Sequence, residues 1–169
     1  MAALHLALTG ENGALLATAT AGELARLAAR GCRTHGAEAA CACPVLAAPA
    51  AVDRYHPAAA RVRFLRLRDR TCRHPGCAQP AGRTDADHVV SYDCGGRTGC
   101  ENLCCLCRTH HRLKTFARGW RFQLLPDGTL RVTTPSGITR TTRPPGLHEP
   151  VEQPALPAPS PPPAEPPPI

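Results

Sequence analysis

Short apolar runs separated by glycine and proline dominate the pattern of this chain, which predicts short strands and helices. Apolar residues at 4–8 and 14–19 flank a glycine-containing segment, an arrangement typical of a β-hairpin. Thr20 then lies three residues before Glu23, in the pattern of a capping box that begins a helix. We therefore expect residues 1–43 to form a small unit of strands and a helix.

A longer amphipathic pattern follows the proline- and alanine-containing stretch 44–57, which we interpret as a linker. Pro57 stands where a first-turn proline would, and the pattern predicts a helix over 58–70. One side of this helix can pack, and the other, basic side is expected to face solvent or phosphate. The packing side holds Val62, Leu65 and Asp69, and the basic side holds Arg63, Arg66 and Arg70.

The middle of the chain predicts two strands followed by a helix. Residues 84–90 alternate as a strand does, 103–106 form a second short apolar run, and a helix is expected to begin near Cys107. This helix is expected to carry the polar residues His110, His111, Lys114 and Arg118.

Beyond that helix the pattern predicts a second hairpin. The β-prone runs 120–125 and 129–134 flank Pro-Asp-Gly at 126–128, and 138–142 is a third candidate strand. The proline-rich residues 143–169 lack apolar side chains to bury, so we expect a disordered or polyproline II tail.

The charge of the chain indicates a partner that carries phosphate. The formal net charge is +7, and the basic residues concentrate between Arg54 and Arg121, which suits a DNA backbone. The alternative explanation is arginine bias in an alanine- and proline-rich coding sequence. No apolar run approaches the roughly 20 residues that span a bilayer, so a membrane protein is not expected.

Ten cysteines in 169 residues indicate either metal binding or disulfides. The first residues lack the basic and sustained apolar regions of a secretory signal, so we expect a cytoplasmic protein whose thiols bind metal. The alternative, a disulfide-bonded extracellular scaffold, fits poorly with the adjacent Cys104 and Cys105, which we expect to be packed thiols.

Two close pairs of metal-binding residues predict a structural zinc site. Cys72 pairs with Cys77, and Cys107 pairs with His110, with a longer loop between the pairs, as tetrahedral zinc sites usually have. Proline and glycine between the first two cysteines favour the tight turn that directs both sulfurs at one ion.

A second group of soft ligands lies earlier in the chain. Cys32, His35, Cys41 and Cys43 fall within twelve residues of one another. Both a second zinc ion and chance clustering in an alanine- and cysteine-rich loop explain this group.

Three residues near the predicted zinc ligands have no role in that site. They are Asp87, His88 and His111. An aspartate and a histidine can hold a hard divalent cation, while a neighbouring histidine can take a proton from water. These residues are therefore the first indication of catalysis.

Residues 54–142 resemble an HNH endonuclease of the repeat family abundant in actinobacteria, in which the nuclease domain follows a longer helical domain. The segments RDRTCRHPGC, Asp-His, Gly-Gly, Asn-Leu, LCxxHHxLKT and GWRFxLxPDG occur in the order of that family. The resemblance implies a ββα-metal core, two strands and a helix around a catalytic ion. It also implies DNA cleavage that leaves a 5′-phosphate and a 3′-hydroxyl. The family's upstream helical domain is missing, so a truncated gene product is one interpretation.

The resemblance also implies a role for each residue that matches the motif. His88 corresponds to the general base, and Asp87 and His111 correspond to the ligands of the catalytic cation. Asn102 corresponds to a structural residue whose amide ties the loop between the strands. The structural zinc ligands correspond to Cys72, Cys77, Cys107 and His110, although cysteine is commoner in the family at the fourth position.

These inferences predict an α+β fold with an HNH nuclease domain over 58–142. This domain would consist of a small zinc-stabilised ββα-metal (HNH) core with a preceding helix and a following hairpin. The expected function is metal-dependent hydrolysis of DNA, with structural Zn²⁺ and catalytic Mg²⁺ or another divalent cation. The alternative is a non-catalytic zinc-stabilised DNA-binding module. The sequence gives no indication of oligomeric state. The residues predicted to contact DNA are Arg66, Arg70, Arg97, Lys114 and Arg118.

Overall fold

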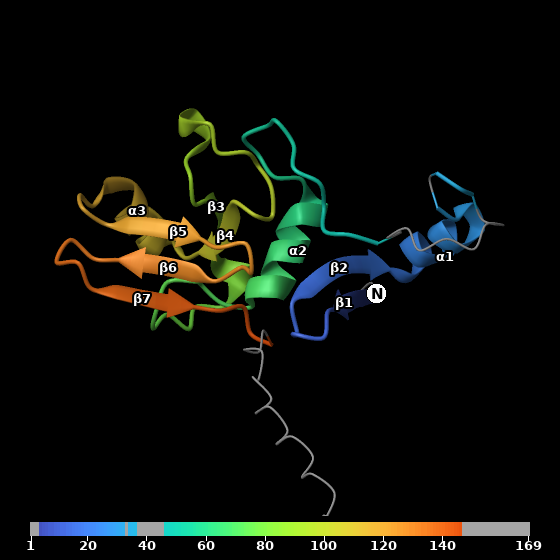
Figure 1. The fold of residues 1–169 in the computed structure, drawn as a ribbon, viewed down its shortest axis with the longest axis horizontal. Helices are drawn as coiled ribbons and strands as arrows, with labels where there is room; N and C mark the ends of the chain where they lie inside the picture. The colour runs from blue at the N-terminus through green and yellow to red at the C-terminus, as the bar shows by residue number, and fades with distance from the viewer. Residues whose placement is uncertain (1–3, 33, 37–45, 147–169) are drawn as a thin grey trace, which may run out of the picture.

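The computed structural model describes residues 4–32, 34–36 and 46–146, and in these ranges the fold is mixed α/β. These residues form three α-helices and three small antiparallel sheets. Figure 1 shows α2 (Ala59–Asp69) in the middle of the molecule. The mixed helix and sheet content predicted from the sequence is confirmed. Among the described residues, no helix combines the length and apolar character needed to cross a membrane.

The N-terminal unit is a hairpin that runs directly into a helix. Strand β1 (His5–Thr9) pairs with β2 (Leu15–Thr20), and α1 (Ala21–Arg30) follows at once. The hydroxyl of Thr20 accepts from the backbone N–H of Glu23 at 3.1 Å, and the Glu23 carboxylate accepts from the Thr20 N–H at 2.6 Å. The predicted hairpin and capping box are both confirmed.

Helix α2 lies between the N-terminal hairpin and the rest of the chain, contacting β2 on one side and the fourth strand on the other. Leu65 and Asp69 are buried and Arg66 and Arg70 are exposed, as predicted. The predicted division into two sides is incomplete, because Val62 and Arg63 are both half-buried. The prediction for Pro57 was wrong, because the N-cap is Ala58 and the proline precedes it. Its fixed φ is accommodated in the extended segment before the helix.

Two strands and a helix form the centre of the second half. Strand β3 (Asp85–His88) pairs with β4 (Leu103–Leu106), and α3 (Arg108–Phe116) begins after the N-cap residue Cys107 and contacts both strands. This order matches the prediction, but Arg118, expected on the helix, lies beyond its last residue.

Two short 3₁₀ turns connect these elements. The turn η1 (Ala81–Arg83) leads into β3, and η2 (Tyr92–Cys94) lies in the long connection between β3 and β4. The stretch predicted as a linker reaches this connection, since Val52 forms a β-bridge with Thr98.

A three-stranded meander follows α3. It consists of β5 (Arg121–Leu124), β6 (Leu130–Thr133) and β7 (Thr139–Thr142), in that spatial order. The Asp127 carboxylate accepts from the backbone N–H of Thr129 at 2.9 Å and shapes the turn between β5 and β6. The predicted hairpin and third strand are confirmed.

The core consists of two small apolar clusters that meet at β4. Because alternate residues of a strand point to opposite faces, β4 supplies both clusters. One cluster contains Cys72, Cys104, Leu106, Leu130 and Val132, and the other contains Leu65, Ala81, Leu103 and Cys105. Cys104 and Cys105 are fully buried free thiols, as predicted.

A buried carboxylate joins the segments around this core. Asp69, at the end of α2, is completely buried. Its Oδ1 accepts from Arg68 Nε at 2.8 Å and from Arg73 Nη1 at 2.9 Å. Its Oδ2 accepts from the backbone N–H of Cys105, on β4, at 2.8 Å. The negative charge of Asp69 is thus neutralised by two arginines, and a backbone N–H of β4 completes its hydrogen bonds.

The two arginines extend these contacts to other loops. Arg68 donates to the carbonyls of Cys100 at 2.6 Å and Leu103 at 2.7 Å. Arg73 donates to the carbonyls of Gly128 at 3.0 Å and Thr142 at 2.6 Å. Burial acts to lower the pKa of Arg68, and the Asp69 carboxylate more than offsets this, so that the pKa lies above its ordinary value.

Two predictions fall largely outside the described residues. The proline-rich tail lies mostly in 147–169, and two members of the second ligand group, Cys41 and Cys43, lie in 37–45.

Replacing Asp69 with asparagine should destabilise the fold strongly. The change leaves two buried arginines without a counter-charge, and breaking a buried ion pair in this way costs about 3–5 kcal/mol. Urea or thermal unfolding of Asp69→Asn measures this effect. The matched control is Asp93→Asn, which removes an exposed carboxylate. Equal stability of the two variants would contradict the role assigned to Asp69.

Candidate metal centre and active site

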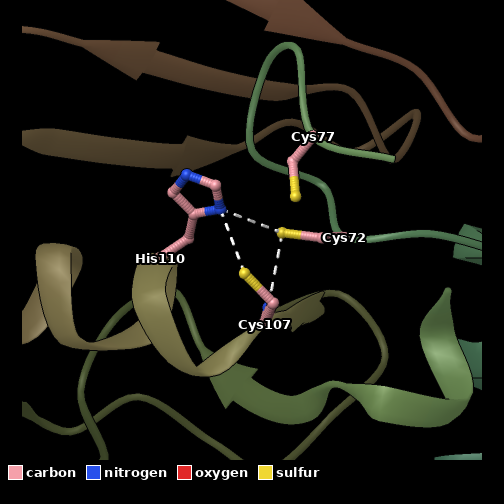
Figure 2. Close-up of side chains that lie close together, drawn as sticks. All are labelled: Cys72, Cys77, Cys107 and His110. Carbon is pink, nitrogen blue, oxygen red and sulfur yellow. Dashed lines mark hydrogen bonds between the residues drawn. The ribbon is translucent and has the colours of Figure 1, made fainter. Parts of the chain in front are cut away.

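The four predicted structural metal ligands gather at one point. The sulfurs of Cys72, Cys77 and Cys107 and a ring nitrogen of His110 all lie within 4.8 Å of one another. Figure 2 shows Cys72 and Cys77 on one loop, with Cys107 and His110 at the start of α3, all directed inward. His110 Nδ1 is 3.2 Å from Cys107 Sγ and 3.5 Å from Cys72 Sγ. This group could hold a metal ion.

Local backbone geometry explains how these side chains converge. The loop from Cys72 to Cys77 turns tightly, with the N–H of Cys77 bonded to the carbonyl of His74 at 3.1 Å and Gly76 at a φ of 79°. On α3, Cys107 is the N-cap and His110 lies three residues on, so both side chains reach the same side of the first turn. The N–H of Cys107 also donates to Cys72 Sγ at 3.3 Å.

Burial disfavours free thiolates at this cluster. Desolvation raises the pKa of the Cys72 thiol to about 12, and the backbone N–H groups of Cys107 and His74 offset only part of this rise. A metal ion offsets this penalty, because thiolate is the form that binds the metal.

A histidine that the sequence reasoning missed covers the cluster. His74 stacks on His110 with ring centroids 3.8 Å apart and planes 1° from parallel. Its Nδ1 lies 3.0 Å from the Pro75 carbonyl, and burial lowers its pKa, which favours the neutral ring. Its position between Cys72 and Cys77 was a signal that it lies near the metal-binding group. The sequence does not reveal its stacking on His110, because the two histidines are distant along the chain.

The earlier ligand group is only partly described. Cys32 Sγ and His35 Nδ1 lie 3.6 Å apart. The other two members are outside the described residues, so the second zinc site stays a prediction.

A second polar cluster lies where α3 faces β3. His111 Nε2 is 3.3 Å from Asp87 Oδ1, and His111 Nδ1 is 2.9 Å from Asp85 Oδ2. Because His110 and His111 are neighbours on a helix, their side chains point about 100° apart. One helix therefore serves both clusters.

Asp87 is a buried carboxylate that lies between a lysine and a histidine. Its side chain is almost fully buried, and desolvation raises its pKa against the lowering effect of Lys114 and His111. Lys114 Nζ is 3.2 Å from Oδ2, an ion-pair distance, on the side of the carboxylate opposite the His111 contact at Oδ1. A buried carboxylate next to a histidine is suited to hold a cation.

His88 is anchored on one nitrogen. Its Nε2 lies 2.7 Å from the hydroxyl of Thr98, and that hydroxyl donates its single proton to the carbonyl of Arg54. The hydroxyl must therefore accept from Nε2–H, which leaves Nδ1 unprotonated. Desolvation lowers the pKa of His88 despite the nearby Asp87, so the neutral ring is favoured.

Aromatic rings enclose His88. Tyr55 stacks on it with centroids 5.5 Å apart and planes 17° from parallel, and Tyr92 lies 5.9 Å away. Tyr92 is in turn held by a 2.9 Å hydrogen bond from its hydroxyl to Asp53. The stretch 44–57, interpreted as a linker, thus contributes to the surroundings of a predicted catalytic residue.

Asn102 bonds across the connection between β3 and β4. Its Oδ1 accepts from the N–H of Val90 at 2.9 Å, and its Nδ2 donates to the carbonyls of Val90 and Arg97, both at 3.0 Å. Gly96 lies against the same amide, because a Cβ there would come within 2.7 Å of Asn102 Nδ2. These contacts hold the end of β3, where His88 lies.

The residues predicted to contact DNA differ in their surroundings. The arginines Arg66, Arg70, Arg97 and Arg118 are exposed. Lys114 is instead only 13% exposed and donates to the His88 carbonyl at 2.6 Å, besides pairing with Asp87. Lys114 therefore belongs to the cluster of Asp87 and His111, whereas the four arginines lie on the surface.

The sequence reasoning missed Asp85, Thr98 and Tyr55. Asp85 stands two residues before Asp87 on a strand, so the period of two was a signal that both carboxylates share a face. Thr98 and Tyr55 gave no such signal, since their contacts with His88 depend on how distant loops meet.

Comparison with known proteins finds relatives in Mycobacterium tuberculosis. The chain is 54% identical over 76 residues to uncharacterized protein Rv3776 of strain ATCC 25618 / H37Rv, which covers 45% of this chain and 14% of the relative. It is 51% identical over 81 residues to uncharacterized protein Rv2100 of the same strain, covering 48% of this chain and 14% of the relative. The chain therefore spans only a small part of the length of these curated relatives. No protein-family model and no solved structure matches it.

Removing one cysteine of the four-residue cluster should lower metal content and stability together. Metal affinity at such a site is folding free energy, on the order of 10 kcal/mol for small metal-dependent domains, so Cys77→Ser should lower the melting temperature markedly. Elemental analysis and thermal unfolding measure both effects. Cys94→Ser, which changes an exposed free thiol, is the matched control. A melting curve that stays the same after chelation would show that no structural metal is bound.

Proposed function

We propose that this chain is a metal-dependent endonuclease of the HNH kind, which hydrolyses phosphodiester bonds in DNA. The observation that carries the proposal is the position of His88. Burial lowers its pKa, which favours the neutral ring, Thr98 anchors its Nε2, and it directly follows Asp87 at the end of β3. A base beside a cation site is what hydrolysis of a phosphodiester requires.

The four-residue cluster fits structural zinc. A tetrahedral ion with bonds of about 2.3 Å to sulfur and 2.0 Å to nitrogen places its ligand atoms roughly 3.5–3.8 Å apart. The two nitrogen–sulfur distances, 3.2 and 3.5 Å, lie close to this spacing. Three thiolates and an imidazole are donors that zinc favours, so Cys72, Cys77, Cys107 and His110 would hold it.

The second cluster fits a harder divalent cation such as Mg²⁺. Neighbouring ligands of an octahedral ion with bonds near 2.1 Å lie roughly 3 Å apart, close to the 3.3 Å between Asp87 Oδ1 and His111 Nε2. Asp85 holds the other ring nitrogen of His111, an arrangement that orients a metal-binding histidine. When bound, the cation would neutralise charge on the scissile phosphate and its leaving oxygen.

Other residues of the chain would accept the proton, orient the base and attract the DNA. His88 Nδ1 has no hydrogen-bond partner among the described residues, so its lone pair can take a proton from the attacking water. Thr98 and Tyr55 fix the direction of the ring, and Lys114 fixes the backbone at the same residue. Exposed arginines and the net charge of +7 supply attraction for the DNA backbone.

Replacing His88 should remove cleavage without removing metal. His88→Ala deletes the proposed base, so nicking of supercoiled plasmid with Mg²⁺ or Mn²⁺ should fall by about 10²- to 10⁴-fold. In contrast, excess Mg²⁺ or Mn²⁺ should partly restore the nicking activity of His111→Ala, because that variant has lost a proposed metal ligand but keeps the proposed base. The matched control is His5→Ala, an exposed histidine on β1.

The same assay tests the non-catalytic alternative. A zinc-stabilised DNA-binding module would bind plasmid without nicking it, and its zinc content would be normal. Full nicking activity in a folded His88→Ala variant would refute the assigned base.

Thr98 should act through His88 and not through stability alone. Thr98→Val keeps the shape of the side chain but removes the acceptor of Nε2–H, so cleavage should fall by up to about 10²-fold, the usual cost of a misplaced group. Thr98→Ser restores the hydroxyl and should recover most of the activity. If both variants lose activity in proportion to their melting temperatures, Thr98 has only a structural role.

A further inference from the structure

A groove runs along the exposed side of α3, next to the second cluster. It has a volume of about 320 Å³ and is lined by Arg108, His111, Arg112, Thr115 and Phe116. Because His111 belongs to both, a ligand in this groove lies directly beside the cluster that contains Asp87.

The lining residues follow the repeat of the helix. Arg108, Arg112 and Phe116 are spaced four residues apart and form one row, with His111 and Thr115 in the adjacent row. At 1.5 Å per residue the row is roughly 12 Å long. This length accommodates a short piece of an extended polymer and exceeds what a single small ion needs.

The row combines positive charge with an aromatic ring. Arg108 is 81% exposed, and its contact with Asp85 at 3.5 Å is a weak surface pair that does not prevent another contact. Arg112 is exposed, and no partner is recorded for it within the described ranges. Phe116 is 73% exposed at the end of the row, the most open aromatic residue in the described part of the chain.

We propose that this groove binds a short stretch of unpaired DNA strand, with a base stacked on Phe116 and phosphates on Arg108 and Arg112. Guanidinium groups attract phosphate, and every base offers a π-face to an exposed ring. An apolar protein partner would not require two arginines in the same row. This inference rests on the proposed function, because it concerns the strand that is led to His111.

The base must be unpaired for this contact. In a duplex the faces of the bases are covered by their neighbours, and a side chain reaches them only by wedging the stack open. Phe116 lies on the surface of a helix end, where a splayed or single-stranded base can approach it freely. The groove should therefore favour single-stranded DNA over duplex DNA of the same length.

Fluorescence anisotropy tests this inference without any cleavage. Labelled oligothymidylate and a duplex of equal length are titrated with the full, zinc-loaded chain, without added Mg²⁺ or Mn²⁺ and at fixed salt. Phe116→Ala should weaken binding of the single strand by about tenfold, the range expected for loss of one base–aromatic stack, and should change duplex binding little. Phe116→Trp should bind the single strand at least as tightly as the native chain does.

The matched control is Ile138→Ala, which removes an exposed apolar side chain from another part of the surface. It should bind both DNA forms as the native chain does. Equal single-strand affinity of Phe116→Ala and Ile138→Ala would overturn the inference, as would equal losses on single-stranded and duplex DNA. Zinc content and melting temperature verify that each variant is folded.

The result is separable from that of the nuclease assay. Phe116-dependent binding of single strands by a chain that never nicks plasmid would support the groove and refute the proposed nuclease. Cleavage by a chain whose single-strand binding does not depend on Phe116 would support the proposed nuclease and refute the groove.

Discussion

The buried carboxylate of Asp69 is the interaction on which the rest of this small structure depends. The apolar clusters are small, and the strands of the second half that surround them are only four residues long. A charge in such a core is tolerated only when it is fully paired. Asp69 meets this condition by accepting from Arg68, Arg73 and the backbone of β4, which brings α2, the cysteine loop and the last sheet together.

The Cys/His cluster and the histidine and carboxylate cluster share α3, and this coupling links stability to the proposed chemistry. Cys107 and His110 fix the first turn of the helix against the Cys72–Cys77 loop. The direction of His111 towards β3 follows from the helix geometry. A change at the first cluster should therefore also displace His111 from Asp85 and Asp87.

Much of the fold could be predicted from local patterns. The capping box at Thr20, the Pro-Asp-Gly turn after β5 and the paired cysteines of the tight loop each specify geometry within a few residues, so sequence spacing is enough to find them. Pro57 and Arg118 were misplaced because helix ends depend on the competition between capping groups and tertiary contacts, which local pattern does not resolve.

The order of the elements and the residue types of the two clusters could be read from the amino-acid pattern. The groups that support these clusters depend on contacts between distant segments. Thr98 reaches His88 because the loop after β3 closes on the segment around Arg54, and Asp85 reaches His111 because β3 packs against α3. Such contacts join residues 10 to 44 positions apart. Their geometry depends on strand register and loop closure, which are set by packing over the whole chain and not by the spacing of neighbours.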